Sequence, residues 1–334
     1  MIEGQFIGVD VGGTKVAVAG LERGALSAPV VRPTTTASTE ALLDQLVAQI
    51  DDVRAPNARA VGIGVPSVVE FATGRIRFSV RVPLADLPLR KILGERVGLP
   101  VYVENDASCA ALAEAYDGDR LVSRDLVMFT VGTGVGGGVV LGGRLYRGAT
   151  GAAPELGHQI IGLDLADGAP AAGEQFPQAG SLETLAAGTE LDRLALRFAH
   201  EHPRSALGRS LAGRGRVSGR DAVEAARAGD EAGLRAVRLL GERLGIGIAN
   251  AINTFDPREV VVGGGVSAAG DLLLEPAREV ARRYTLPGVG TEATIRLARR
   301  GAEAGVLGAA LLAAQELTDD LRPTQPPPIE EPAR

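Results

Sequence analysis

Gly8-Val-Asp-Val-Gly-Gly-Thr-Lys15 joins one β-branched run to another, Val16-Ala-Val-Ala19, through a glycine turn. The arrangement returns about 120 residues later in Thr130-Val-Gly-Thr-Gly-Val-Gly-Gly-Gly-Val-Val140. Both stretches predict a strand, a tight turn and a second strand. Because glycines have no Cβ, such a turn leaves several backbone N–H groups uncovered, and that concavity binds anions. One turn in each half of the chain predicts two lobes that grip the phosphates of a single nucleotide.

An acidic pair lies between the two turns, in Glu104-Asn105-Asp106. It follows a short apolar strand expected over 101–104 and precedes an Ala-rich helix expected over 107–116. Asp106 can serve as the N-cap of that helix, or as the base that accepts a hydroxyl proton during phosphoryl transfer. Its spacing fits both roles. The positive end of the helix dipole favours the ionised carboxylate in either case.

Two better-known phosphate motifs are not present. Gly132–Gly137 matches the G-x-G-x-x-G pattern of dinucleotide-binding proteins, but that interpretation requires a helix directly after the glycines. The apolar run 139–141 instead predicts a strand. A Walker A sequence is absent because Thr14 and Lys15 stand in the reverse order. The turns therefore indicate a phosphate site of another kind.

Length and composition indicate a two-domain globular protein. The chain has 334 residues, of which 45% are hydrophobic and 23% charged. Its net charge of −6 argues against a nucleic-acid partner. Cys109 is the only cysteine, so no intrachain disulfide can form, which fits a reducing cytoplasm. The N-terminus lacks the features of a signal peptide, and the uncharged stretch 126–143 predicts a glycine-rich hairpin rather than a membrane span.

The order of expected elements divides the chain into two lobes and a tail. Residues 1–118 plus 303–317 are expected to form a small lobe and residues 119–302 a large one, each with a mixed sheet covered by helices. Residues 318–334 are expected to form a disordered, proline-rich tail. Residues 181–198 predict a single helix, and the arginine-rich stretch 200–220 predicts a solvated loop.

Two motifs bring carboxylates and an imidazole into an irregular segment, namely Glu155-Leu-Gly-His158 and Gly180-Ser-Leu-Glu183. Their side chains can be solvated loop charges or contacts to a polar substrate. A structural zinc site is not favoured, because His158 has no cysteine near it in the sequence.

The chain resembles the ROK family (repressors, open reading frames and sugar kinases) from about Phe6 to Leu312. Any one of the matching motifs is weak, but the ordered set is specific. The motifs are Asp10-Val-Gly-Gly-Thr-Lys15, Gly62-Ile-Gly-Val-Pro66, Glu104-Asn-Asp-Ala107, Gly132-Thr-Gly-Val-Gly-Gly-Gly138, Glu155-Leu-Gly-His158, Gly263-Gly-Gly-Val-Ser267 and Ala304-Gly-Val-Leu-Gly-Ala-Ala310.

This resemblance implies an α/β, actin-like, hexokinase-type (ribonuclease H-like) fold with a cleft between two lobes. It implies an ATP-dependent sugar kinase that uses Mg²⁺, assembles as a dimer or tetramer, and has Asp106 as the base toward the sugar 6-hydroxyl. Asp10 is placed to hold Mg²⁺ through water. The implied sugar-binding residues are Asn105, Asp106, Glu155, His158 and Glu183. The implied nucleotide-binding residues are Asp10, Gly12, Gly13, Thr14, Lys15, Thr133, Gly134, Gly264 and Gly265.

The chain departs from the family pattern at several positions. Family members usually bind zinc through the histidine of the Glu-x-Gly-His motif and three cysteines before the Glu183 position. Here Ser181 replaces one cysteine and the others are missing, so no structural zinc is expected. Another feature must then order the long segment 159–180. The family's Asn-x-x-x-Trp region reads Arg81-Val-Pro-Leu-Ala85, which leaves the identity of the sugar open.

The expected function is a cytoplasmic, ATP-dependent hexose kinase that phosphorylates O6, with glucose as the expected sugar. Only about six residues precede the first strand, so the DNA-binding helix-turn-helix of the family's repressors is not expected. Three alternatives stay open. They are a kinase of an amino or N-acetyl hexose (kanosamine, N-acetylglucosamine or N-acetylmannosamine), a glucokinase that uses polyphosphate, and a non-catalytic sugar sensor or actin-like assembly protein.

Overall fold

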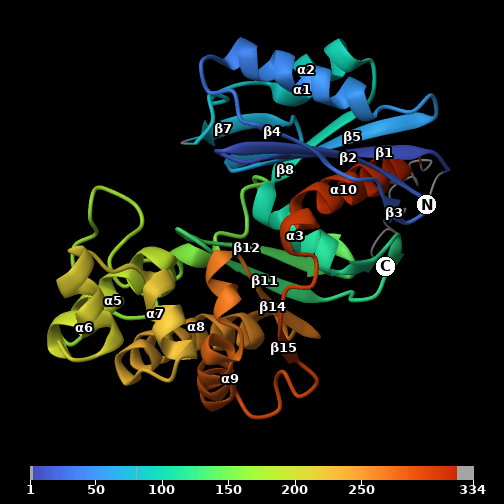
Figure 1. The fold of residues 1–334 in the computed structure, drawn as a ribbon. Coiled ribbons are helices and arrows are strands. Elements are labelled where there is room, and N and C mark those ends of the chain that lie inside the picture. The colour runs from blue at the N-terminus through green and yellow to red at the C-terminus, as the bar shows by residue number, and fades with distance from the viewer. Residues whose placement is uncertain (1–2, 80, 322–334) are drawn as a thin grey trace, which may run out of the picture.

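The computed structural model describes residues 3–79 and 81–321 and confirms a mixed α/β fold (Figure 1). The strands of its first sheet are β1 (Gln5–Val11), β2 (Lys15–Glu22), β3 (Ala25–Leu26), β4 (Val30–Pro33), β5 (Ala58–Val65) and β8 (Val101–Asn105). The strand order is β3-β2-β1-β5-β8, and β4 also pairs with β2. β1 is antiparallel to β2 and parallel to β5, so the first glycine turn is the β1–β2 hairpin, as predicted.

A second sheet repeats this opening in the other half of the chain. Its strands are β11 (Leu126–Val131), β12 (Val135–Leu141), β13 (Arg144–Leu145), β14 (Glu259–Gly263) and β15 (Thr294–Leu297). β11 pairs antiparallel with β12 and parallel with β14. The second glycine turn therefore lies at the β11–β12 hairpin, in the same relation to its sheet as the first turn. The predicted second strand-turn-strand arrangement is confirmed.

Helices lie on both faces of the first sheet. α1 (Thr39–Val53) and α2 (Leu89–Val97) cover its outer face, where Leu42, Leu46 and Leu93 are fully buried. α3 (Asp106–Glu114) and α10 (Ala304–Asp320) lie between the two sheets (Figure 1). α10 packs so closely on β1 and β5 that a Cβ on Gly8 or Gly62 would collide with its backbone.

Most of the remaining helices lie in the half of the chain that forms the second sheet. They are α4 (Leu182–Ala186), α5 (Gly188–Glu201), α6 (Ala206–Arg214), α7 (Gly219–Arg227), α8 (Glu231–Phe255) and α9 (Asp271–Tyr284). Two predictions here are wrong. The stretch 200–220 contains α6 rather than an open loop, and the helix expected over 181–198 is broken at Ala187 into α4 and α5.

Short elements complete the described chain. They are β6 (Ser67–Glu70), β7 (Arg75–Ser79), β9 (Tyr116–Asp117), β10 (Arg120–Leu121) and the 3₁₀ turns η1 (Leu156–His158), η2 (Gly265–Ala269) and η3 (Gly301–Glu303). The prediction that a disordered tail begins at residue 318 is wrong for residues 318–320, because α10 continues to Asp320. The rest of that prediction, residues 322–334, lies outside the described residues. In the described ranges, no helix combines the length and apolar character needed to cross a bilayer.

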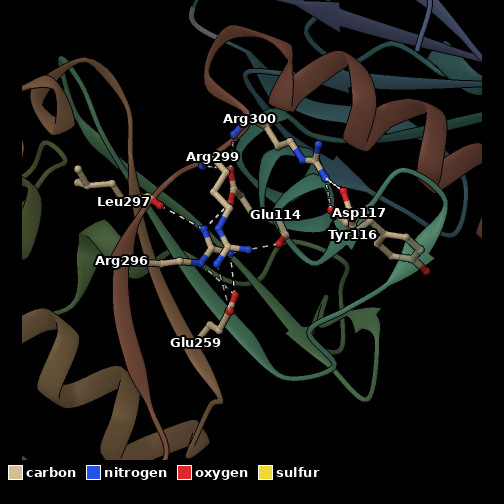
Figure 2. Close-up of polar contacts among 8 residues, drawn as sticks. All are labelled: Glu114, Tyr116, Asp117, Glu259, Arg296, Leu297, Arg299 and Arg300. Carbon is tan, nitrogen blue, oxygen red and sulfur yellow. Dashed lines mark hydrogen bonds and ion pairs between the residues drawn. The ribbon is translucent and has the colours of Figure 1, made fainter. Parts of the chain in front are cut away.

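A buried carboxylate fastens the segment that leads from β15 into α10 (Figure 2). Glu114, in the last turn of α3, accepts hydrogen bonds from the backbone N–H groups of Arg299 and Arg300 at 2.7 and 2.8 Å. Its second oxygen accepts from Arg296 Nη1 at 2.6 Å, and Arg296 also pairs with Glu259 at 2.7 Å. This segment, the crossing of the chain from the second sheet back to the first, is thereby bonded to both α3 and β14.

Candidate active site

The first glycine turn is closed by its own backbone. Gly12 N–H donates to the Lys15 carbonyl at 2.8 Å, and the Thr34 hydroxyl donates to the Gly12 carbonyl at 2.6 Å. Lys15 lines a cavity of about 520 Å³ together with Asp10. Gly12, Gly13 and Thr14 do not line that cavity or the two described next, so the structure brings Lys15, but not the rest of the predicted turn residues, to the wall of the crevice.

The second glycine turn is held by residues of α4 and of the link between α4 and α5. Gly132 N–H donates to the Gly134 carbonyl at 2.8 Å, and Gly188 N–H donates to the Gly132 carbonyl at 2.7 Å. Val135 N–H donates to Glu183 Oε2 at 2.7 Å. The link between α4 and α5 therefore fixes the turn, and Glu183 reaches it because it lies in the first turn of α4.

Three cavities adjoin along this second turn. All five predicted sugar-binding residues line a single cavity of about 360 Å³. It shares Asp106, Thr130 and Gly264 with the cavity that contains Asp10 and Lys15. It shares Gly132 and Thr133 with a third cavity, of about 730 Å³, whose wall includes Gly265. The result is one continuous crevice with a polar pocket in the middle, which is the usual form of a small-molecule site.

Gly264 allows the crevice to run past the end of β14. Its φ is +85°, and a Cβ at this position would collide with the backbone of Val131 at the end of β11. Only glycine fits both conditions. The chain can therefore turn sharply between the two cavities that Gly264 lines.

Asp106 begins α3 but does not cap it. The cap is Asn105, whose Oδ1 accepts from the N–H groups of Ala107 and Ser108 at 2.9 and 3.2 Å. Asp106 Oδ1 accepts a hydrogen bond from Ala107 N–H at 2.8 Å, and its side chain lines the central cavity. Asn105 accepts the hydrogen bonds of free N–H groups at the N-terminus of α3 and so leaves Asp106 available for a substrate.

The helix dipole was predicted to favour the ionised form of Asp106, but the net shift of its pKa has the opposite direction. Burial raises the pKa of this carboxyl, and the hydrogen bond from Ala107 N–H and the charge of Arg81 lower it by less. The helix end acts in the predicted sense, but desolvation outweighs it. The carboxylate is consequently a stronger proton acceptor than a solvated aspartate, which favours the role of a base.

Asp10 shares the crevice with Asp106. Burial, followed by the negative charge of Asp106, raises the pKa of Asp10 from its ordinary 3.8 to about 6, against the opposing charge of Lys15. The folded protein therefore binds more protons than the unfolded chain between about pH 4 and pH 6. By linkage, the carboxyl of Asp10 lowers the free energy of unfolding progressively as the pH rises through this interval.

Replacing Asp10 by Asn is expected to raise stability at pH 7 to 8 by about 1–3 kcal/mol, because a neutral isostere carries no desolvation penalty for charge. The gain should vanish below about pH 4, where both side chains are neutral. Thermal unfolding without nucleotide or metal, followed from pH 4 to pH 8, measures the difference. A gain that persists unchanged at pH 4 would contradict the assignment to Asp10.

Glu155 and His158 also line the central cavity. His158 Nε2 lies 3.9 Å from Glu155 Oε2. Burial raises the pKa of Glu155, His158 opposes that shift, and the charges of Glu183 and Asp106 add to it. The ring of Phe176 meets the His158 ring edge-on, with centroids 5.7 Å apart. The segment 159–180 therefore supplies one aromatic contact to the imidazole.

Backbone and side-chain hydrogen bonds order the segment 159–180, at whose end a cysteine of the family's zinc site would stand. Ile161 N–H donates to the Gly180 carbonyl at 2.8 Å, and Leu182 N–H donates to the Gln159 carbonyl at 2.8 Å. Ser181 is fully buried, and its hydroxyl caps α4 by accepting from Thr184 N–H. Among residues 3–79 and 81–321, no group of three or more His, Cys, Asp or Glu side chains is arranged to hold a metal ion.

Sequence reasoning assigned no role to two charged groups at the site. Glu104, almost fully buried, accepts from Arg147 Nε at 2.7 Å, and Arg147 also pairs with Glu316 at 2.9 Å while lying over the Phe71 ring at 3.5 Å. These contacts fix the end of β8 just before Asn105. Arg81, the second group, lines the central cavity. The only sequence signal for Arg81 was its place in the region where the chain departs from the family's Asn-x-x-x-Trp pattern.

Comparison with known proteins gives three findings. A sequence model of the ROK family matches residues 6–316. The chain is 36% identical to a glucokinase from Halalkalibacterium halodurans (93% of this chain, 95% of that protein) and 32% identical to an N-acetyl-D-glucosamine kinase from Vibrio vulnificus (92% and 98%). The structure of a ROK family glucokinase from Streptomyces griseus, in complex with glucose and AMPPNP, is 34% identical over 93% of this chain and 100% of that chain, with a TM-score of 0.74.

Proposed function

The chain belongs to the ROK family, and from that membership we propose that it transfers the γ-phosphoryl group of ATP to the 6-hydroxyl of glucose. It is a sugar kinase with the predicted two-lobed, actin-like fold. The observation that carries the sugar-kinase proposal is the central cavity, where the five predicted sugar-binding residues meet beside the second glycine turn. The similarity to glucokinases favours glucose as the sugar. Carboxylates and amides at such a spot are acceptors and donors for sugar hydroxyl groups.

Asp106 is the base in this proposal. It accepts the proton of the 6-hydroxyl as the phosphoryl group moves across, while Asn105, Glu155, His158 and Glu183 hold the other hydroxyl groups. Catalysis of this kind consists mostly of positioning and charge stabilisation, because the transition state is loose. Phosphates would lie along Lys15, Gly264 and the Thr133–Gly134 turn, with the adenosine toward the cavity beside Gly265.

Asp10 fits a role toward Mg²⁺. Its carboxylate faces the cavity that Lys15 lines and makes no hydrogen bond within the described part of the chain. Carboxylate oxygen is a preferred Mg²⁺ ligand, and one carboxylate with substrate phosphates and water is a common set. Mg²⁺ that arrives with ATP would neutralise phosphate charge.

The proposed reaction also involves movement of the two lobes relative to each other. We place the small lobe at residues 1–118 plus 303–317 and the large lobe at 119–302, with the crevice between them. Closure of the two lobes would exclude water and align donor and acceptor. We also propose a cytoplasmic location, in keeping with the single buried thiol of Cys109, and assembly as a dimer or tetramer.

A coupled assay of ADP release over a hexose panel tests the proposal. With ATP, the expected order of kcat/KM places glucose first, ahead of mannose, glucosamine, kanosamine, N-acetylglucosamine and N-acetylmannosamine. The similarity to an N-acetyl-D-glucosamine kinase makes that amino sugar the second candidate. A preference for an N-acetyl hexose would replace glucose in the proposal, turnover with polyphosphate in place of ATP would replace the donor, and no sugar-dependent turnover at all would support a sensor.

A further inference from the structure

Arg81 follows the β6–β7 hairpin and lines the central cavity together with Asp106. Its side chain starts beside the first glycine turn. A Cβ built on Gly13 would lie 3.4 Å from the Arg81 Cβ and 3.8 Å from its Cδ. Arg81 thus lies beside the first glycine turn and lines the same cavity as the proposed base.

The charge of Arg81 has no partner within residues 3–79 and 81–321, where neither an ion pair nor a hydrogen bond of its side chain occurs. The hairpin's other arginines are different, because Arg75 pairs with Asp86 at 2.6 Å and Arg77 with Glu70 at 2.5 Å. The field of Arg81 nevertheless reaches the base, since its charge lowers the pKa of Asp106. An unpaired guanidinium that faces a reaction centre is available to an incoming anion.

The cavity needs such a cation. Asp106, Glu155 and Glu183 already line it, and a phosphoryl group in transfer brings further negative charge onto its equatorial oxygens. Lys15 lies in the neighbouring cavity and not in this one. A guanidinium also matches phosphate oxygens in a planar, bidentate way that an ammonium does not.

We propose that Arg81 is a catalytic residue that binds the γ-phosphoryl group during its transfer to the sugar. This inference rests on the proposed kinase function and adds to it a charge-stabilising group supplied by the loop after β7. Its geometry places positive charge where charge develops in the transition state, and a group of that kind acts on kcat more than on sugar binding.

The test compares Arg81→Gln and Arg81→Lys with Arg77→Gln, a matched control from the neighbouring strand. The assay uses saturating ATP and whichever hexose the unmodified enzyme turns over fastest, and the sugar Kd is measured by calorimetry. Arg81→Gln is expected to lower kcat by about 10²–10³-fold, with the sugar Kd changed less than about twofold. Arg81→Lys should retain part of the activity, Arg77→Gln nearly all of it, and added guanidinium ion should partly restore an Arg81→Ala variant.

A pH profile separates this role from a purely structural one. The Arg81 charge and the N–H groups of Ala107 and Asp106 lower the pKa of Asp106. The charge of Asp106 in turn raises the pKa of Asp10 and of Glu155. Loss of the Arg81 charge should move the acid limb of kcat/KM to higher pH, whereas Arg77→Gln should leave it in place.

Two results would overturn the inference. One is a kcat within about threefold of the unmodified enzyme, and the other is a large rise in the sugar Kd with kcat preserved, which would make Arg81 a sugar contact. Failure of the kinase proposal itself has a different signature, since none of the hexoses would then support ATP turnover by the unmodified protein.

Discussion

Replacing Asp106 by Asn is expected to lower turnover by about 10²–10⁴-fold, the usual contribution of a general base. The amide has nearly the same shape and can still accept from Ala107 N–H through its oxygen, but it cannot take the proton of a sugar hydroxyl. Initial rates of ADP release at saturating hexose and ATP measure the effect. The sugar Kd should change far less than the rate, because Asn105, Glu155 and Glu183 remain in the cavity.

The same substitution is expected to stabilise the protein at neutral pH. Burial raises the pKa of Asp106, so the folded state holds the charged form less well than the unfolded chain does, and a neutral residue removes that cost. A variant that is inactive through misfolding would show the opposite, a lower melting temperature. Asp44→Asn, on the exposed face of α1, is the matched control and should alter neither quantity. Preserved turnover in a folded Asp106→Asn protein would remove Asp106 from the role of base.

Local sequence determines those parts of the fold and site that were predicted. A glycine turn between β-branched runs has few alternatives to a hairpin, and both predicted hairpins are confirmed as β1–β2 and β11–β12. Each hairpin could be predicted because its backbone geometry depends mainly on its own residues. The five polar side chains that meet in the central cavity were instead implied by the resemblance to the ROK family.

Features that depend on distant partners escaped prediction. The Arg147 pairs join positions 43 and 169 residues apart, and no pattern within either segment specifies them. Burial decided the net pKa direction at Asp106, and burial is a property of the packed lobes. α6 is different, since its Ser205 cap and the left-handed Gly215 at its end are local signals. The run of arginines obscured them.

Replacing Glu114 by Ala is expected to lower the free energy of unfolding by about 3–5 kcal/mol, because it removes one partner from a buried ion pair. Arg296 would lose Glu114 and keep Glu259 as a charged partner (Figure 2). Two backbone N–H groups, those of Arg299 and Arg300, would also lose their acceptor. Denaturant unfolding of the folded, ligand-free protein measures the loss.

A double-mutant cycle identifies the cause of that loss. If the ion pair carries the effect, Glu114→Ala with Arg296→Met should be less destabilised than the sum of the single variants, since each single variant already loses the interaction between the two side chains. Glu242→Ala is the matched control, because its exposed pair with Arg238 on α8 should contribute less than about 1 kcal/mol. A Glu114→Ala variant as stable as this control would mean that the carboxylate does not hold the crossing.

The contacts of Glu114 are expected to affect activity as well as stability. Glu114 fastens residues 299 and 300, just before the proposed return of the chain from the large lobe to the small lobe at 302–303. A loosened crossing should therefore impair the closure that aligns sugar and ATP, and kcat should fall in the Glu114→Ala variant at temperatures where it remains folded. Unchanged kcat together with a large stability loss would restrict Glu114 to holding the two lobes together.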